Sequence, residues 1–267
     1  MTLFIDESLI TAPIWAPIRE EWIETDVDVD IRAGLKAADV GPGDVALISG
    51  PEAARLARTH FIDPSVAIVV EAVSPIAMRT PVRPDGVEET PIRMLDTGPT
   101  AEVLMRALLR PYFGITASTF VTDAEDPAGA DAQVVVVDGV LGLSEPEDGY
   151  QEDLAKAWFV LTGAATVHAV TVVGVEAEAR GADAELALLK EAVAVGTERR
   201  RDVRRIMAAD EELDRDRLVR LTNTMRFEMT AEDRQSLRNL MARGTWGTDY
   251  PRQLPAFRDE VEAAGEE

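Results

Sequence analysis

The segment LDTGPTAEVLMRALL, residues 95–109, has the features of an anion-binding turn. Apolar residues end a strand before the turn, and after it they recur at helical spacing. A helix that begins here presents unpaired backbone N–H groups, which bind a carboxylate or a phosphate. The candidate contacts are Thr97, Gly98, Thr100 and Ala101. A simple cap with Pro99 in the first turn explains the same residues without a ligand.

A second strand-to-helix junction, SGPE, follows the apolar run VALI. Gly50 permits close approach of a ligand to the backbone, and the hydroxyl of Ser49 caps the helix or donates to a ligand. By itself, this junction is weak evidence for an anion-binding site. If the two junctions face each other, they would hold opposite ends of one small anion.

Two histidines and three aspartates could also act in catalysis or bind a metal, but structural roles explain them as well. His60 is expected at a helix end, and His168 lies within an apolar run, where it either faces a cleft or sits in the core. Asp26, Asp28 and Asp30 alternate as on one face of a strand, but exposed acids are common in so acidic a chain. We therefore expect no metal site.

Composition narrows the function further. The net charge of −22 over 267 residues disfavours nucleic acid and anionic membranes as partners. There is no cysteine, and no GxGxxG, Walker, GxSxG or HExxH pattern. The N-terminal residues are acidic where a signal peptide is basic, and no apolar run is long enough to span a bilayer. We expect a cytoplasmic monomer or homodimer that binds a small molecule.

Short apolar runs alternate with helical patterns, which predicts an α/β fold with largely parallel strands. The expected strands are residues 3–5, 45–48, 66–70, 134–137 and 167–173. The expected helices are residues 52–60, 101–113, 151–161, 182–195, 214–225 and 231–242. Thr230, followed by acids, caps the last of these helices.

The proline-rich stretch 74–100 is expected to be hairpin-like and to hold a crossing between two lobes, with a return near 170–174. This assigns residues 1–76 and 175–267 to a first, discontinuous lobe and residues 77–174 to an inserted second lobe. Such a chain forms a clamp, and its ligand position is the cleft between the lobes.

Several stretches together resemble one family, the chorismate dehydratases of the futalosine route to menaquinone, with their 1,4-dihydroxy-6-naphthoate synthase siblings. The matching stretches are APIWAPI, DVALISGPEAARLAR, SVAIVVEAVSPIAM, LDTGPTAEVLMRALL, DAQVVVVDGVLGL, EDLAKAWFVLTGAATVHAV and RLTNTMRFEMTAEDRQSLRNLMARG. The resemblance covers nearly the whole chain. It implies a two-lobed fold like that of type 2 periplasmic binding proteins, and a lyase that removes water from chorismate without a cofactor, giving 3-enolpyruvylbenzoate.

The resemblance also implies site residues, and the chain departs from the family at some of them. The family's YLN-x-x-P turn, whose asparagine faces the substrate, corresponds to LITAP, so Ile10 replaces that asparagine. Gly50 stands where a serine is expected. Thr11 and Ser74 remain as catalytic candidates.

We expect a small aromatic or cyclic carboxylate such as chorismate to contact Ser49, Gly50, Ser74, Thr97, Gly98, Thr100 and Ala101. The alternative is a clamp of the same fold that binds such a ligand, as a sensor for example, without converting it. The sibling synthase fits less well, because its characteristic N-terminal turn is absent.

Overall fold

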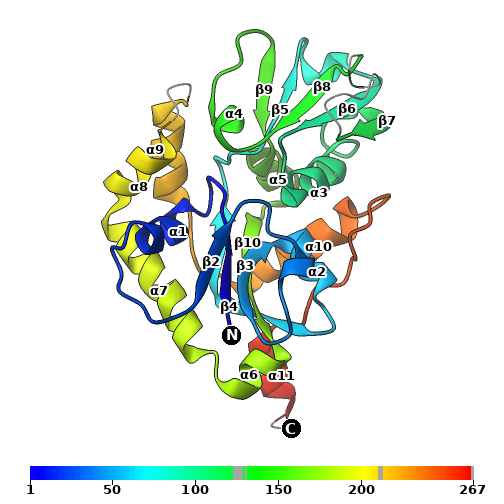
Figure 1. The fold of residues 1–267 in the computed structure, drawn as a ribbon. Helices are drawn as coiled ribbons and strands as arrows, with labels where there is room; N and C mark the ends of the chain where they lie inside the picture. The colour runs from blue at the N-terminus through cyan, green and yellow to red at the C-terminus, as the bar shows by residue number, and fades with distance from the viewer. Residues whose placement is uncertain (123–128, 130, 210–212, 266–267) are drawn as a thin grey trace.

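The computed structural model describes residues 1–122, 129, 131–209 and 213–265, which form two lobes, each built on a five-stranded sheet (Figure 1). The first sheet has the order β2-β1-β3-β10-β4. Its strands are β1 (Leu3–Asp6), β2 (Val29–Arg32), β3 (Val45–Ser49), β4 (His60–Val70) and β10 (Thr166–Gly174). The strands predicted within β1, β3, β4 and β10 are confirmed, and the alternating acids of residues 26–30 overlap the start of β2.

The second sheet has the order β7-β6-β8-β5-β9. Its strands are β5 (Ala77–Thr80), β6 (Glu89–Leu95), β7 (Thr116–Val121), β8 (Val134–Val137) and β9 (Tyr150–Asp153). The prediction of a hairpin-like segment over residues 74–100 was wrong, because β8 lies between β5 and β6. The 3₁₀ turn η2 (Pro84–Gly86) lies in that connection, and η1 (Ala37–Asp39) precedes β3.

Both sheets are mixed, so the expectation of largely parallel strands was only half right. β1 runs parallel to β2 and β3, and β6 runs parallel to β7 and β8. β10 is antiparallel to both of its neighbours, and so is β5. β5 is the first strand of the second lobe, and β10 is the first strand after the chain returns to the first lobe.

The pairing of β10 corrects the predicted lobe boundary. The predicted second lobe, residues 77–174, includes β10, yet β10 pairs with β3 and β4 of the first sheet. The return crossing therefore lies before Thr166, since α5 ends at Thr162 and β10 begins four residues later. An apolar run buried on both faces indicates a strand, but it does not indicate which sheet the strand joins.

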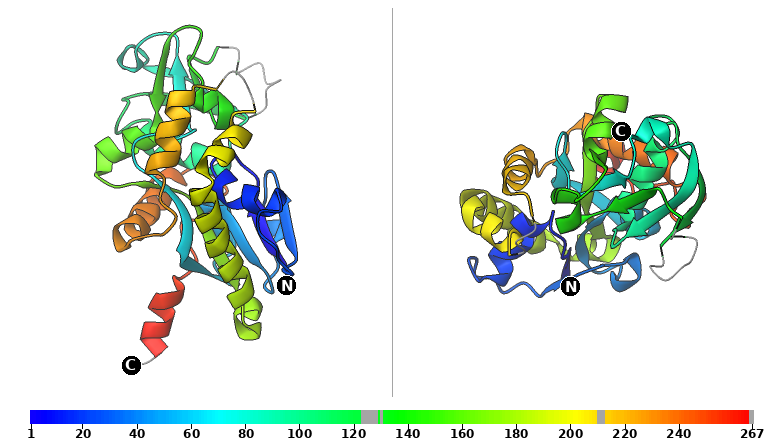
Figure 2. Two further views of the ribbon diagram at one scale, coloured as in Figure 1. Left: turned by 90° about the vertical axis from the view of Figure 1, so that its left-hand side faces the viewer. Right: turned by 90° about the horizontal axis from the view of Figure 1, so that it is seen from above.

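Helices cover both lobes (Figures 1 and 2). Those of the second lobe are α3 (Pro99–Leu108), α4 (Gly139–Leu143) and α5 (Leu154–Thr162). Those of the first lobe are α1 (Ala12–Arg19), α2 (Gly50–Arg55), α6 (Val175–Arg180), α7 (Asp183–Glu198), α8 (Arg200–Met207), α9 (Arg215–Thr224), α10 (Ala231–Gly244) and α11 (Arg258–Gly265). None of the described helices is long and apolar enough to cross a membrane.

Local sequence explains several helix ends. Thr230 caps α10 as predicted, and with Asp233 it forms a capping box. The carboxylate of Asp153 accepts hydrogen bonds from two amides in the first turn of α5, and Gly163 ends that helix at a φ of +73°. α1 was not predicted, because its two prolines and central tryptophan do not resemble a helical pattern.

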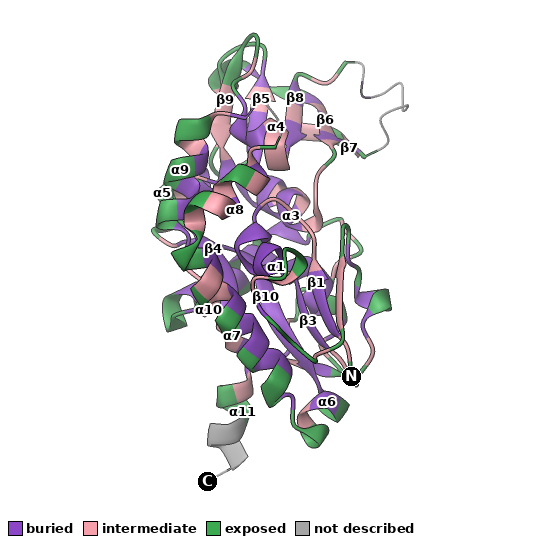
Figure 3. Ribbon diagram, turned by 60° about the vertical axis from the view of Figure 1, so that its left-hand side comes forward, coloured by how far each residue is buried: buried purple, intermediate pink, exposed green. Residues whose placement is uncertain are grey.

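The lobes are joined by more than the two crossing segments. The apolar core continues from α3 of the second lobe to α10 of the first, through Val103, Leu104 and Leu240 among others. Most residues of α3 are buried (Figure 3). Gly244 of α10 lies so close to α3 that an added Cβ would meet the carbonyl oxygen of Val103 at 2.0 Å. Trp158 of α5 is fully buried, and its indole nitrogen donates to the hydroxyl of Ser236 on α10 at 2.9 Å. α3 and α5 thus hold the second lobe against the first.

Candidate functional site: a cleft between the lobes

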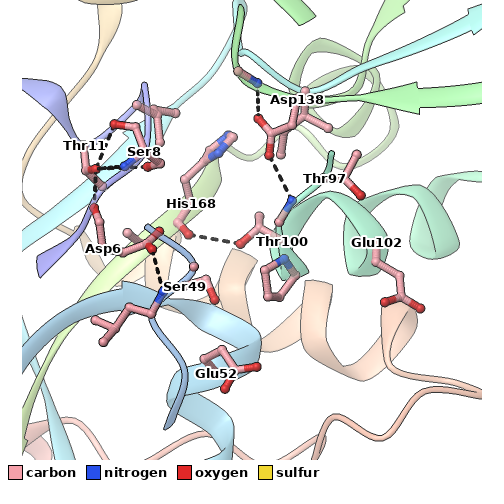
Figure 4. Close-up of a pocket in the computed structure, with 18 of the residues that line it drawn as sticks. Asp6, Ser8, Thr11, Ser49, Glu52, Thr97, Thr100, Glu102, Asp138 and His168 are labelled. Atoms are coloured by element: carbon pink, nitrogen blue, oxygen red, sulfur yellow. Dashed lines mark hydrogen bonds between the residues drawn. The ribbon is translucent and has the colours of Figure 1, made fainter. Parts of the chain in front are cut away.

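A cleft of about 660 Å³ separates the two sheets. The first lobe contributes the β1–α1 loop, residues 34–36, the β3–α2 junction and two residues of β10. The second lobe contributes the end of β6, the start of α3 and the β8–α4 junction (Figure 4). Apolar walls come from Leu9, Ile10, Leu35, Ile76, Met94 and Ala169. A cleft of this volume, with apolar walls and few polar groups, has the dimensions of a small-molecule site.

Asp138 is the most perturbed acid in the cleft. It follows β8 and caps the short helix α4, and its carboxylate accepts hydrogen bonds from the amides of Gly139 at 2.7 Å and Gly98 at 3.4 Å. Asp138 lines the cleft and is half-buried. This burial, together with the charge of Asp6, raises the pKa of Asp138 to about 6.

His168 enters the cleft from an irregularity in β10. Val167 pairs with Val69 and Ala169 with Ile68, so His168 is the extra residue of a bulge. Bulges redirect a side chain, and the ring of His168 lines the cleft although only 5% of the residue is exposed. Its Nε2 has no hydrogen-bond partner among the described residues. Burial lowers the pKa of His168 to about 3, so the ring is neutral near pH 7.

Three of the four predicted contacts at the start of α3 line the cleft. These are Thr97, Gly98 and Thr100, whereas Ala101 is fully buried beneath them. Thr97 lines the cleft, and its hydroxyl forms no hydrogen bond with any described residue, so it is available to a ligand. The hydroxyl of Thr100 is not, because it donates to the carbonyl oxygen of His168 at 3.1 Å and so links the two lobes.

The second predicted junction reaches the cleft only in part. Ser49 lines it, and so does Glu52, whose carboxylate accepts the amide of Ala37 at 2.8 Å. Gly50 is buried, and a Cβ there would meet the side chain of Leu237 at 3.0 Å. In this chain Gly50 therefore accommodates α10 and does not line the cleft.

Thr11 and Ser74, the two catalytic candidates, form hydrogen bonds that hold the fold together. Thr11 lines the cleft but is 1% exposed, and its hydroxyl donates to the carbonyl oxygen of Asp6 at 2.6 Å. Ser74 does not line the cleft. Its amide and hydroxyl bond to the carboxylate of Asp153 at 2.6 and 3.1 Å, which fixes the outgoing crossing to the start of α5. Ile10 presents an apolar wall to the cleft and is 7% exposed.

The cleft is acidic. Its lining includes six carboxylates, from Asp6, Glu7, Glu52, Asp96, Glu102 and Asp138. Glu7, Glu52 and Glu102 form ion pairs with Arg19, Arg55 and Arg106, respectively. Asp6 accepts the amide of Leu35 at 3.1 Å, and burial raises the pKa of its carboxyl group. Lys36 provides the cationic amine among the described lining residues. An anionic ligand therefore gains from Lys36 and loses from Asp6 and Asp138.

The chain matches a family model described as menaquinone biosynthesis over residues 27–245. It belongs to the menaquinone biosynthesis family. The matched range includes β3, α3, β8 and β10, which supply most of the cleft. A comparison with curated protein sequences finds no match.

Solved structures resemble this family member across almost its whole length. A protein from Archaeoglobus fulgidus is 12% identical with a TM-score of 0.63, and the match covers 90% of this chain and 96% of that one. The ligand-binding component of an ABC-type import system from Staphylococcus aureus is 14% identical, with a TM-score of 0.61 and coverages of 97% and 94%. The alkanesulfonate-binding protein SsuA from Xanthomonas axonopodis pv. citri is 9% identical, with a TM-score of 0.63 and coverages of 90% and 91%. These matches show the two-lobed fold of periplasmic binding proteins.

The remaining sequence candidates lie away from the cleft. His60 is the first residue of β4, not a helix end, and its ring bonds to Thr59 and to the carbonyl oxygen of Gly41. Asp28 accepts a hydrogen bond from the hydroxyl of Thr2, and Asp30 pairs with Arg32. Within the described ranges, no group of three or more metal-ligating side chains is found. Sequence reasoning missed Asp6 and Asp138, which directly follow apolar strand residues.

Proposed function

We propose that this member of the menaquinone biosynthesis family is a lyase that removes water from chorismate and releases 3-enolpyruvylbenzoate. The observation that carries the proposal is the cleft, which combines apolar walls for a ring with polar groups at its floor, in a chain of this family. Loss of water from a ring involves no net oxidation or reduction, so the proposed reaction needs no redox cofactor.

The proposed substrate is a cyclic carboxylate, and the cleft offers contacts for both of its parts. Ile76 and Met94 contact the ring, and the hydroxyl of Thr97 and the ammonium of Lys36 contact a carboxylate. Ser49 supplies a further hydroxyl from the first lobe. The fold neighbour described as an alkanesulfonate-binding protein bound to MOPS supports binding of a small anion by this fold. A cytoplasmic location and a monomeric or homodimeric state remain part of the proposal.

The test is conversion of chorismate by the purified protein. Substrate and product are separated by chromatography and identified by mass, over a series of salt concentrations because the chain carries a charge of −22. We expect chorismate to disappear and 3-enolpyruvylbenzoate to accumulate in equal amount. Absence of product at every salt concentration, from protein that unfolds cooperatively, refutes the lyase.

A second candidate is a clamp that binds a cyclic carboxylate without converting it. Ile10 favours it, because an alkyl group in the cleft wall neither accepts nor orients a proton. Ligand at 100 times its dissociation constant stabilises the fold by about 2.7 kcal/mol, which thermal unfolding detects. Stabilisation by chorismate without product formation supports the clamp, and stabilisation with product formation supports the lyase.

A further inference from the structure

Two residues that line the cleft, Asp138 and His168, are both bonded to the same helix. The carboxylate of Asp138 accepts the amide of Gly98, and the backbone carbonyl of His168 accepts the hydroxyl of Thr100 (Figure 4). Both anchors belong to the first turn of α3 and its cap. Asp138 comes from the second lobe and His168 from the first, so α3 sets where these two side chains lie relative to each other.

Neither side chain is fully used by the protein itself. Nε2 of His168 is buried and without a hydrogen-bond partner among the described residues, which is rare for a buried nitrogen. The neutral ring offers a ligand either one donor or one acceptor at Nε2. Asp138 keeps free lone pairs beyond the bonds to Gly98 and Gly139, and it exchanges a proton near pH 6. A ligand hydroxyl, which both donates and accepts, complements this pair.

We propose that Asp138 and His168 form a hydroxyl-binding subsite of the cleft, in which Asp138 is the proton-transfer group of the elimination. The inference rests on the proposed function. The Asp138 carboxylate takes the proton from the ring carbon next to the one that bears the hydroxyl. The electrons of that C–H bond form the new ring double bond as the C–O bond breaks, and the departing hydroxide takes the same proton back from Asp138. Water leaves and the carboxylate is restored, while Nε2 of His168 holds the hydroxyl in place.

Binding of two unreactive acids tests the subsite without turnover. Benzoate and 4-hydroxybenzoate differ by one hydroxyl, placed across the ring from the carboxylate. We expect calorimetry to show 4-hydroxybenzoate binding about tenfold more tightly, the effect of a hydrogen bond to a buried polar group. The ratio of the two dissociation constants is then measured in variants. Asp138→Asn keeps the shape of the side chain, His168→Phe removes the ring nitrogens, and His168→Gln restores an amide that bonds to a hydroxyl.

The expected result is loss of the tenfold ratio in Asp138→Asn and His168→Phe, with partial recovery in His168→Gln. Asp96→Asn is the matched control, because it removes another carboxylate from the cleft lining, at a φ of +50° that asparagine tolerates. It keeps the ratio. Equal binding of the two acids by the wild type overturns the subsite and leaves the proposed function standing. Failure of both acids to bind while chorismate is converted overturns the subsite alone. Failure of both acids to bind and of chorismate to react overturns the proposed function and the subsite together.

A kinetic comparison adds a second readout. We expect Asp138→Asn to lower kcat for chorismate by at least about a hundredfold while KM changes little, as for loss of a proton-transfer group. His168→Phe is expected to raise KM as well, since it removes a binding contact. Unchanged kcat in folded Asp138→Asn overturns the role of Asp138.

Discussion

Replacement of Asp138 by asparagine is expected to stabilise the folded protein at neutral pH. The pKa of Asp138 rises from 3.8 to about 6 on folding, because burial disfavours the charged carboxylate. At about 1.4 kcal/mol per pKa unit, the folded state pays about 3 kcal/mol to keep this group ionised. Asparagine carries no charge, and its carbonyl oxygen still accepts a hydrogen bond from the amide of Gly139.

The effect has a defined pH dependence. Between about pH 4 and about pH 6 the folded protein holds a proton on Asp138 that the unfolded chain has released, so wild-type stability falls as pH rises. The advantage of Asp138→Asn therefore grows over this window and is constant above it. The other titratable groups lining the cleft are Asp6, Glu7, Lys36, Glu52, Asp96, Glu102, His168 and Tyr250. They are present in both proteins, so the difference between the two isolates Asp138.

Urea unfolding of both proteins at a series of pH values measures this difference. We expect equal free energies of unfolding near pH 4 and a gain of about 3 kcal/mol for the variant near pH 7. Since about 1 kcal/mol shifts Tm by about 2–4 °C in a chain of this size, thermal unfolding near pH 7 should show a rise of about 6–12 °C. A variant no more stable than the wild type near pH 7 refutes the assigned burial of this carboxylate. Asp96→Asn controls for the general loss of a negative charge.

Three further predictions concern packing and charge. Trp158→Ala should lower the free energy of unfolding by about 3–5 kcal/mol in urea, because it leaves a cavity and removes a bond to Ser236. Phe159→Ala, at the next and 40% exposed position, should cost far less, and equal costs would contradict the packing described. Gly244→Ala should destabilise the protein or separate α3 from α10, because its Cβ would meet a carbonyl oxygen at 2.0 Å; an unchanged Tm would count against that contact. Lys36→Met should weaken calorimetric binding of benzoate and reduce its salt dependence, whereas no change in either would exclude Lys36 as a carboxylate contact.

The sequence predicted the fold class because its strongest signals are local. Buried strands are continuous apolar runs, and the turn at residues 95–100 joins a strand to a helix as predicted. The helix begins at Pro99 and ends at Leu108, whereas residues 101–113 were predicted. Strand direction was not predictable in the same way. β10 has the composition of a central parallel strand, but its antiparallel pairing depends on where the chain re-enters the first lobe.

The site was less predictable, because the partners of a polar side chain are set by tertiary structure. The sequence shows that Thr100 and Thr11 carry hydroxyl donors, but it does not show their partners. In the structure Thr100 donates to the backbone carbonyl oxygen of the distant His168, and Thr11 donates to that of the nearby Asp6. His168 could be assigned to the cleft or to the core, and the bulge in β10 places its ring in the cleft. Asp138 belongs to the stretch DAQVVVVDGVLGL, which carries part of the family resemblance. Its raised pKa results from burial in the folded protein, which the sequence alone does not predict.

A crystal structure of the protein soaked with 4-hydroxybenzoate, at a concentration that saturates binding in solution, tests the central claim most directly. The ring should lie between the β1–α1 loop and α3, with its hydroxyl on Asp138 and Nε2 of His168 and its carboxylate towards Thr97 and Lys36. A ligand bound on the outer surface, or a cleft without ligand density at that concentration, would contradict the assignment of this cleft as the binding site.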